Sequence, residues 1–223
     1  SLLANKQEWV TPYVERALRM AERDKNHASI IFWSLGNESG HGPNHAAMAG
    51  YLHEFDPTRP IHYEGAQNNM SGGPTAFDPN WVDVRSRMYA TIEEMVEMAN
   101  QDADGRPVVW CEYAHSMGNS TGNLNEFWDA IRREERMIGG FIWDWIDQGL
   151  IRVDENGNEQ WTYGGDYGEK KHDGNFCLNG VITADQQAKP ETWEMKKIYQ
   201  PVAITRYANP EDYRSYEFGI RNW

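Results

Sequence analysis

The sequence predicts an α/β protein with a parallel sheet built from (β/α) units. Up to Asp147, short apolar runs alternate with amphipathic helical patterns at a spacing of roughly thirty residues, which is typical of parallel sheets. Two of these runs end in a glutamate, Glu38 and Glu112, and each glutamate precedes a turn rich in Gly, Ser or Asn. A (β/α) barrel carries its catalytic groups at these carboxyl ends of its strands.

The first third of the chain predicts two helix–strand pairs. Thr11 is suited to cap a helix and Pro12 to fill its first turn, and apolar residues then recur at helical spacing until Asn26. The continuous apolar run at 30–33 is typical of a buried parallel strand. The expected elements are a helix at 11–25, a strand at 29–35, a helix at 43–55 and a strand at 61–65.

The middle of the chain continues the alternation. Thr91 and Glu94 have the spacing of a capping box, which opens a helix. Gly139 and Gly140 indicate a turn that leads into the last apolar run. We expect a long loop at 66–83, strands at 83–90, 107–113 and 141–146, and helices at 91–100 and around 124–131.

Beyond Asp147 the pattern changes. Residues 148–200 are rich in Gly, Asp and Asn and are expected to be irregular, whereas antiparallel strands are expected after Pro201. We therefore place a domain boundary near residue 200. Five parallel strands cannot close an eight-stranded barrel. Either the fold is not a barrel, or the chain is a fragment that begins after the third strand.

Composition narrows the functional class. With 39% hydrophobic and 25% charged residues, the chain can bury a core. A formal charge of −13 argues against nucleic acid and anionic membranes as partners. No apolar stretch is long enough to span a bilayer. The two cysteines, Cys111 and Cys177, do not form a disulfide scaffold, and we expect a free thiol at Cys111.

The two glutamates provide the groups that glycoside hydrolysis requires, because one can protonate the leaving oxygen while the other attacks the anomeric carbon. Their spacing, 112 − 38 = 74 residues, fits two or three (β/α) units, so the two can meet across one pocket. Taken alone, Glu38 is more simply explained as a carboxylate at a helix N-terminus. For Glu112 a functional role is the better explanation, because burying an unpaired carboxylate in a strand without such a role would cost several kcal/mol.

Four motifs carry a resemblance to a known family. These are GNESGH at 36–41, CEYAHSMGNS at 111–120, FIWDWIDQ at 141–148 and NFCLNG at 175–180. In order and spacing they resemble the glycoside hydrolases of family 2. More narrowly, they resemble the large multidomain β-galactosidases of the bacterial lactose-operon type, over essentially the whole chain.

The resemblance implies a role for each matching residue. Glu38 matches the acid/base and Glu112 the nucleophile of a retaining enzyme. The implied substrate-binding residues are Asn37, at the sugar 2-hydroxyl, Tyr89, which hydrogen-bonds the nucleophile, His115, and Trp143, an apolar wall beneath galactose.

Two metal ions are implied by the same resemblance. Glu38 matches a Mg²⁺ ligand, while the Phe176 carbonyl and the Asn179 side chain match Na⁺ ligands. The family's remaining ligands have no counterpart in this sequence, so we expect both sites to be incomplete in this chain. A transition-metal site at His41 and His45 is less favoured than a solvated helix start.

The resemblance therefore selects the fragment interpretation: a partial TIM (β/α)8 barrel (strands 4–8) at 1–200, followed by the first strands of a β-sandwich at 201–223. The parent enzyme would be a homo-oligomer that hydrolyses terminal non-reducing β-D-galactose with retention, and the isolated fragment would be inactive. The alternatives are a β-glucuronidase or β-mannosidase of the same family, or an inert carbohydrate-binding fragment. The compartment stays open, with the cytoplasm favoured over the periplasm.

Overall fold

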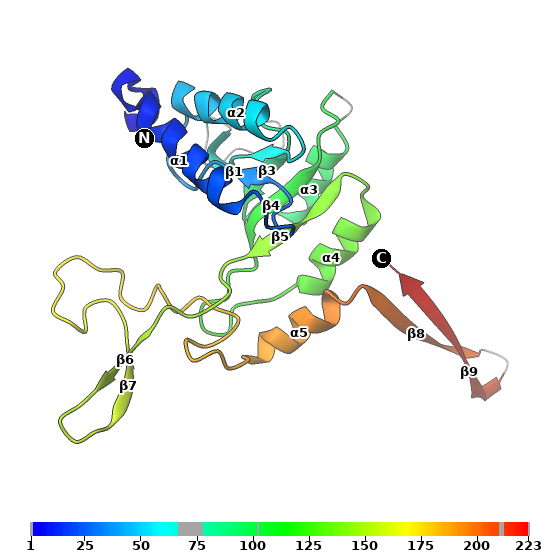
Figure 1. Ribbon diagram of the computed structural model, residues 1–223. Helices are drawn as coiled ribbons and strands as arrows, with labels where there is room; N and C mark the ends of the chain where they lie inside the picture. The colour runs from blue at the N-terminus through cyan, green and yellow to red at the C-terminus, as the bar shows by residue number, and fades with distance from the viewer. Residues whose placement is uncertain (1, 67–77, 102, 210–211, 223) are drawn as a thin grey trace. The chain divides into compact units, whose positions relative to one another are not determined.

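The computed structural model describes residues 2–66, 78–101, 103–209 and 212–222 (Figure 1). The chain forms two compact units. Unit 1 comprises Ser1–Tyr113 and Arg133–Phe141, and unit 2 comprises Ala114–Arg132 and Ile142–Trp223.

Unit 1 has the expected alternation of helices and parallel strands. Strands β1 and β2 pair in parallel, β3 and β4 pair in parallel, and a parallel bridge between His62 and Val84 links the two pairs. Strand β5 lies beside β4. The elements are α1 (Val10–Asp24), β1 (Trp33–Ser34), α2 (Pro43–Phe55), β2 (Ile61–His62), β3 (Arg85–Met88), α3 (Ile92–Ala99), β4 (Val108–Tyr113) and β5 (Met137–Ile142), with short 3-10 turns at Leu2–Asn5, Gln7–Trp9 and Glu64–Ala66.

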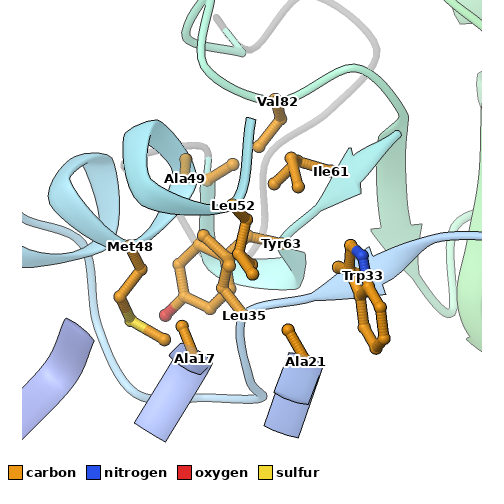
Figure 2. Packing of buried hydrophobic residues seen from close by; sticks show 11 residues of the cluster. Ala17, Ala21, Trp33, Leu35, Met48, Ala49, Leu52, Ile61, Tyr63 and Val82 are labelled. Carbon is orange, nitrogen blue, oxygen red and sulfur yellow. The ribbon is translucent and has the colours of Figure 1, made fainter. Parts of the chain in front are cut away.

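The hydrophobic core of unit 1 lies between α1, α2 and the first two strands (Figure 2). Helix α1 contributes the small side chains of Ala17 and Ala21, which let the helix approach closely, while Leu52 comes from α2. Trp33 of β1 and Tyr63, just after β2, are almost completely buried. This core fixes the ends of β1 and β2, where Glu38 and Glu64 follow.

The helices of unit 1 lie close to the predicted ranges. Helix α2 matches the expected 43–55 range. The capping box of α3 is confirmed, because the Thr91 side chain accepts a hydrogen bond from the Glu94 amide and the Glu94 carboxylate accepts one from the Thr91 amide. The prediction that Thr11 caps α1 is wrong: the cap position is Trp9, and Thr11 lies inside the first turn.

The strands differ more from prediction. Strand β1 is confined to Trp33–Ser34 instead of 29–35, and β2 ends at His62 because the chain turns into the 3-10 segment at Glu64. Strand β5 begins four residues earlier than the expected 141–146 range. Gly139 and Gly140 lie inside β5. A Cβ at Gly140 would come within 2.9 Å of the Tyr113 ring, so this glycine permits close strand packing and does not mark a turn.

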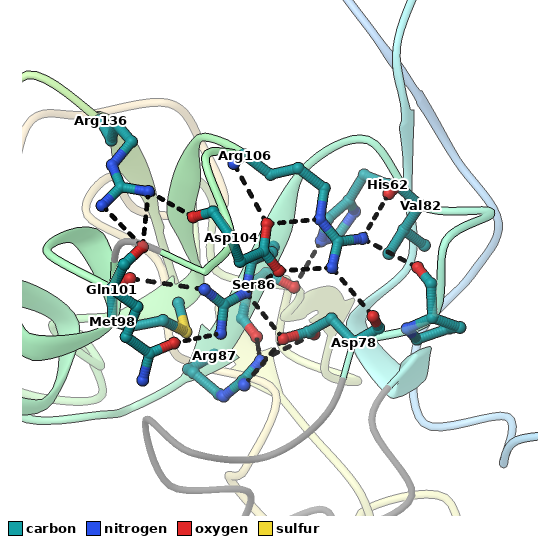
Figure 3. Close-up of polar contacts among 12 residues, drawn as sticks. His62, Asp78, Val82, Ser86, Arg87, Met98, Gln101, Asp104, Arg106 and Arg136 are labelled. Carbon is teal, nitrogen blue, oxygen red and sulfur yellow. Dashed lines mark hydrogen bonds and ion pairs between the residues drawn. The ribbon is translucent and has the colours of Figure 1, made fainter.

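A buried network of charges supports β3 (Figure 3). Arg85 and Arg87 lie two residues apart, so both project from the same face of the strand. Both guanidinium groups contact Asp78, at 2.9 Å and 3.0 Å, and all three side chains are at most 3% exposed. Asp104 lies 3.4 Å from Arg85 and also binds Arg106. The segment before β3 is therefore tied to the strand by ion pairs in addition to the apolar packing of Val82 and Val84.

In unit 2, the expectation that 148–200 is irregular is confirmed for residues 163–189, which contain no helix or strand, and is wrong for the segments on either side. The turn at 154–158 joins two antiparallel strands, and Pro190 lies in the first turn of a helix, where proline is favoured. In the same unit, the Trp128 and Tyr199 rings lie 4.8 Å apart. The elements are α4 (Leu124–Arg133), β6 (Leu150–Val153), β7 (Glu159–Thr162), α5 (Pro190–Ile198), β8 (Val202–Asn209) and β9 (Asp212–Asn222).

Strands β8 and β9 form the antiparallel pair that the sequence predicts after Pro201. That they begin a β-sandwich is not shown, and the boundary near residue 200 stays a prediction. Most of the loop expected at 66–83 lies outside the described residues. In the described parts of the chain, no helix is long and apolar enough to cross a membrane.

Candidate active site

The backbone takes a left-handed conformation at the ends of β1, β3 and β4. Glu38, Tyr89 and Ala114 have φ values of 45°, 52° and 48°, which are uncommon for residues with a side chain. Such strained positions cost about 1–3 kcal/mol each and cluster where a site needs particular side-chain directions. Two of the three are residues for which the sequence predicts a functional role.

Glu112 and Tyr89 form the first part of the site. Their strands are neighbours, and the Tyr89 amide donates a 2.9 Å hydrogen bond to the Glu112 carbonyl. The Tyr89 hydroxyl donates to the Glu112 carboxylate. Burial, reinforced by the negative charge of Glu112, raises the pKa of Tyr89, so the phenol stays a hydrogen-bond donor. Glu112 is half-buried and paired, which removes the cost expected for an isolated buried carboxylate.

Glu38 and Glu64 form the second part. The Glu38 amide donates a 2.8 Å hydrogen bond to the Glu64 carboxylate. Glu64 is 4% exposed, and burial raises its pKa, with a further contribution from the charge of Glu38. Glu64 was not among the residues predicted from the sequence. The signal was present, because Glu64 follows the β2 run and precedes Gly65, the same strand–carboxylate–turn pattern that singles out Glu38.

A row of polar side chains lies across the strands. The two ring nitrogens of His62 contact the Ser34 hydroxyl of β1 at 2.9 Å and the Ser86 hydroxyl of β3 at 2.8 Å. Burial lowers the pKa of His62 to about 4, so the ring is neutral near pH 7. Burial also raises the pKa of Cys111 to about 12. Cys111 is a free thiol, as expected.

Four neighbouring strands thus bring polar groups to one edge of the sheet. Glu38, Glu64 and Tyr89 follow β1, β2 and β3, and Glu112 lies near the end of β4. The Tyr89 hydroxyl is hydrogen-bonded to Glu112, and the charges of Glu112 and, to a smaller extent, Glu38 add to the effect of burial in raising the pKa of Tyr89. The two glutamates that the sequence singles out therefore lie at the same edge of the parallel strands as Tyr89 and Glu64.

The other predicted site residues belong to unit 2, apart from Asn37, which is exposed beside Glu38. The His115 ring stacks on Phe176 with 5.5 Å between ring centres. The Asn179 side chain donates to the Phe176 carbonyl at 2.7 Å, and its own main-chain carbonyl accepts from the Asp144 amide. The Trp143 carbonyl, next in the chain to Asp144, accepts from the Ser116 amide. The four predicted site residues of unit 2 are thus linked to one another, directly or through a neighbouring residue: His115, Trp143, Phe176 and Asn179.

The structure offers one feature that fits a cation. Asn179 is 2% exposed, and its Oδ1 atom has no hydrogen-bond partner within the described part of the chain. A buried amide oxygen of this kind suits a hard cation, as does the nearby Phe176 carbonyl. Among the described residues, no group of three or more His, Cys, Asp or Glu side chains could hold a metal ion. His45 is fully buried, so its expected place in a solvated helix start is wrong.

Comparisons with known proteins agree on the fold and differ in the sugar named. The β-galactosidase of Pseudoalteromonas haloplanktis is 42% identical over 214 residues, which cover 91% of this chain and 20% of the relative. That of Psychromonas ingrahamii is 44% identical over 211 residues, covering 90% and 20%. The chain thus spans about a fifth of the length of these curated relatives.

Similar solved structures include a β-glucuronidase from Ruminococcus gnavus in complex with uronic isofagomine. It has a TM-score of 0.61, is 20% identical, and the match covers 86% of this chain and 36% of that one. A β-glucuronidase from an uncultured Clostridium sp. has a TM-score of 0.57 at 18% identity, with 84% and 35% covered. At these identities the likeness shows the fold alone.

The family model for the TIM barrel domain of glycosyl hydrolases family 2 matches residues 1–204. That range contains both glutamates and all four motifs on which the resemblance was based. The parallel strands of unit 1, with their polar groups at one edge, are what part of such a barrel requires. The chain therefore belongs to glycosyl hydrolase family 2 and forms part of its TIM barrel domain.

Proposed function

We propose that this chain carries the catalytic pair of a retaining β-galactosidase, with Glu112 as nucleophile and Glu38 as acid/base. The observation that supports this most strongly is that Glu38 and Glu112 lie at the same edge of the parallel strands, with the Tyr89 hydroxyl hydrogen-bonded to Glu112. Retention requires the two carboxyl groups to lie roughly 5–5.5 Å apart, and we expect that separation in the complete enzyme. A separation near 9 Å would instead leave room for a water molecule and imply inversion.

The proposed reaction has two steps. Glu112 attacks the anomeric carbon and forms a galactosyl-enzyme, while Glu38 gives its proton to the departing oxygen. Glu38 then takes a proton from water as the water oxygen attacks the anomeric carbon and displaces the Glu112 carboxylate, so that galactose leaves with its configuration retained. The Tyr89 hydroxyl orients the Glu112 carboxylate for attack through its hydrogen bond. Asn37, next to the acid/base, would bind the sugar 2-hydroxyl, a contact that tightens in the transition state.

Galactose is favoured over glucuronic acid or mannose as the sugar. The relatives named β-galactosidases reach 42–44% identity, whereas the solved β-glucuronidases share only about a fifth of their residues. In unit 2, the stacked His115 and Phe176 rings and the apolar face of Trp143 suit a neutral sugar ring. A panel of nitrophenyl β-glycosides tests this choice on the full-length enzyme: the galactoside should be hydrolysed fastest, and a faster glucuronide or mannoside would contradict it.

Cations belong to the proposal as well. Asn179 Oδ1 and the Phe176 carbonyl would hold Na⁺ near the sugar 6-hydroxyl, and Glu38 would be one ligand of Mg²⁺. The Asn179 and Phe176 oxygens are both neutral, which suits a weakly bound alkali ion. The remaining Na⁺ ligands would have to come from other residues of the enzyme. We also propose that the full-length enzyme is a homo-oligomer.

Glu38→Gln in the full-length enzyme should reduce kcat/KM by about 10²–10⁴-fold on substrates with poor leaving groups. The loss should be much smaller on a dinitrophenyl galactoside, because its leaving group departs without a proton. Steady-state kinetics on both substrates measure the difference. The exposed Glu97 of α3 supplies a matched control, and Glu97→Gln should behave like wild type. Equal losses on the two substrates would remove Glu38 from the acid role.

The isolated 223-residue chain should hydrolyse no β-galactoside, because we propose that it is part of a longer enzyme. Its described residues provide five strands of unit 1 beside the catalytic edge, fewer than the eight of a closed barrel. A sugar pocket built from this portion alone lacks part of its wall. The measurement is nitrophenyl galactoside hydrolysis by the chain after gel filtration has removed longer protein. Turnover that co-elutes with the chain would show that the prediction is wrong.

A further inference from the structure

Residues just after β2 form hydrogen bonds to the turn that contains Glu38. Two successive residues after this strand, Tyr63 and Glu64, each reach this turn with their side chains. The turn itself contains left-handed φ values at Gly36, Glu38 and Gly40, of 141°, 45° and 82°. A non-glycine residue in this conformation needs its surroundings to hold it there. The contacts from Tyr63 and Glu64 meet this need.

Glu64 holds the main chain at the acid/base residue itself. Its Oε2 atom accepts the 2.8 Å hydrogen bond from the Glu38 amide, and the side chain is 4% exposed. A hydrogen bond from an amide to a carboxylate is stronger than one between neutral groups, and burial protects it from competition by water. The direction of the Glu38 side chain follows from φ at Glu38, which this bond fixes from the amide side.

Tyr63 holds the next two residues of the turn. Its hydroxyl lies 2.9 Å from the Ser39 hydroxyl and donates to the Gly40 carbonyl. The Tyr63 ring is 1% exposed and stacks on His45 of α2 with 4.2 Å between ring centres. The His45 Nε2 atom in turn contacts the Ser39 hydroxyl at 3.1 Å. Because Tyr63 belongs to the hydrophobic core, this turn is connected directly to the packed interior of unit 1.

We propose that Glu64 is a positioning residue for the acid/base: its buried carboxylate, assisted by Tyr63, holds the Glu38 turn so that the Glu38 carboxyl meets the leaving oxygen. This inference rests on the proposed function. It assigns to β2 a part in proton transfer, although the residues that react lie after β1 and within β4. The essential group is the hydrogen-bond acceptor at Oε2, so glutamine, which keeps an oxygen at this place, should largely replace it.

The test compares Glu64→Ala with Glu64→Gln in the full-length enzyme. The quantity measured is kcat/KM, which reports the galactosylation step, on lactose and on a dinitrophenyl galactoside. Misplacing a catalytic group by about 1 Å costs on the order of 10²-fold. We therefore expect Glu64→Ala to lose about 10–100-fold on lactose and far less on the activated substrate. Glu64→Gln should recover most of the lactose activity.

Glu191 provides a matched control, because it is another buried glutamate, 6% exposed, in unit 2. Glu191→Ala should change both substrates by the same factor, since it can only lower the amount or stability of folded enzyme. If Glu64→Ala fails to fold, Tyr63→Phe decides, because it removes the hydroxyl on Ser39 and Gly40 but keeps the ring. A loss selective for lactose supports the proposal, and equal losses on both substrates overturn it.

Two results overturn the inference alone, with wild-type enzyme active on β-galactosides. One is an equal loss on both substrates for Glu64→Ala, as for the Glu191 control. The other is a Glu64→Gln enzyme as impaired on lactose as Glu64→Ala, because the acceptor oxygen would then not be what matters. Wild-type enzyme inactive on every β-galactoside would instead overturn the proposed function, and this inference with it.

Discussion

Glu112→Gln should abolish turnover of β-galactosides by the full-length enzyme, with kcat lowered on the order of 10⁴–10⁶-fold, as when other enzymes lose their nucleophile. Glutamine has nearly the same shape and can still accept the hydrogen bond from Tyr89. It cannot form the galactosyl-enzyme, because a neutral amide is a poor nucleophile. Steady-state kinetics with a nitrophenyl galactoside measure this loss of kcat.

The fold should survive this substitution. Glu112 is half-buried, and its main-chain bond from the Tyr89 amide does not depend on the side chain. Thermal unfolding should therefore show a midpoint within a few degrees of wild type, while Glu97→Gln on the exposed face of α3 should leave both activity and stability unchanged. Activity within tenfold of wild type would mean that another residue is the nucleophile.

Asp78→Ala should destabilise the chain by about 3–5 kcal/mol, the cost of removing one partner from a buried ion pair. Asp78 is the shared partner of Arg85 and Arg87, and its side chain is 1% exposed. Arg87 would lose both of its contacts to this carboxylate, at Oδ1 and Oδ2. Because β3 leads to Tyr89, this loss should also disturb the catalytic edge. Urea denaturation of the 223-residue chain measures the difference.

The control for this prediction is an exposed pair of similar length. Glu22 lies 2.7 Å from Lys25 on α1, and both side chains are nearly half exposed. Glu22→Ala should cost no more than about 1 kcal/mol, because solvent screens such pairs. A cost for Asp78→Ala equal to that of the control would mean that the buried ion pairs do not hold β3 in place.

Two helix starts were predicted correctly, because the sequence pattern that determines each of them lies within a few residues. The capping box at Thr91 and the helix beginning at Pro43 are of this kind, and both were predicted. Glu38 and Glu112 were found because each carboxylate follows an apolar strand pattern and precedes a turn rich in Gly, Ser or Asn. Tyr89 could be assigned only through the family resemblance, since nothing in its own neighbours distinguishes it from a core aromatic residue.

The sequence was less informative about residues whose structural role depends on a partner far away in the chain. Gly140 resembles a turn residue until the Tyr113 ring, far back in the chain, is seen to lie against it. The same is true of Glu64, whose pattern was visible but whose role depends on the Glu38 amide 26 residues earlier. The burial of Arg85 and Arg87 likewise depends on acidic partners outside β3, Asp78 and Asp104.

The most direct test of the central claim is to trap the covalent intermediate. An activated 2-fluoro β-galactoside accumulates the galactosyl-enzyme, because fluorine destabilises the oxocarbenium-like transition states of both steps while the good leaving group restores the rate of the first step only. Mass spectrometry of the digested full-length enzyme should then find the fluorogalactosyl group on the peptide that contains Glu112. Attachment to any other residue, or release of the inverted sugar with no covalent adduct, would contradict the assignment of Glu112 as the nucleophile of a retaining enzyme.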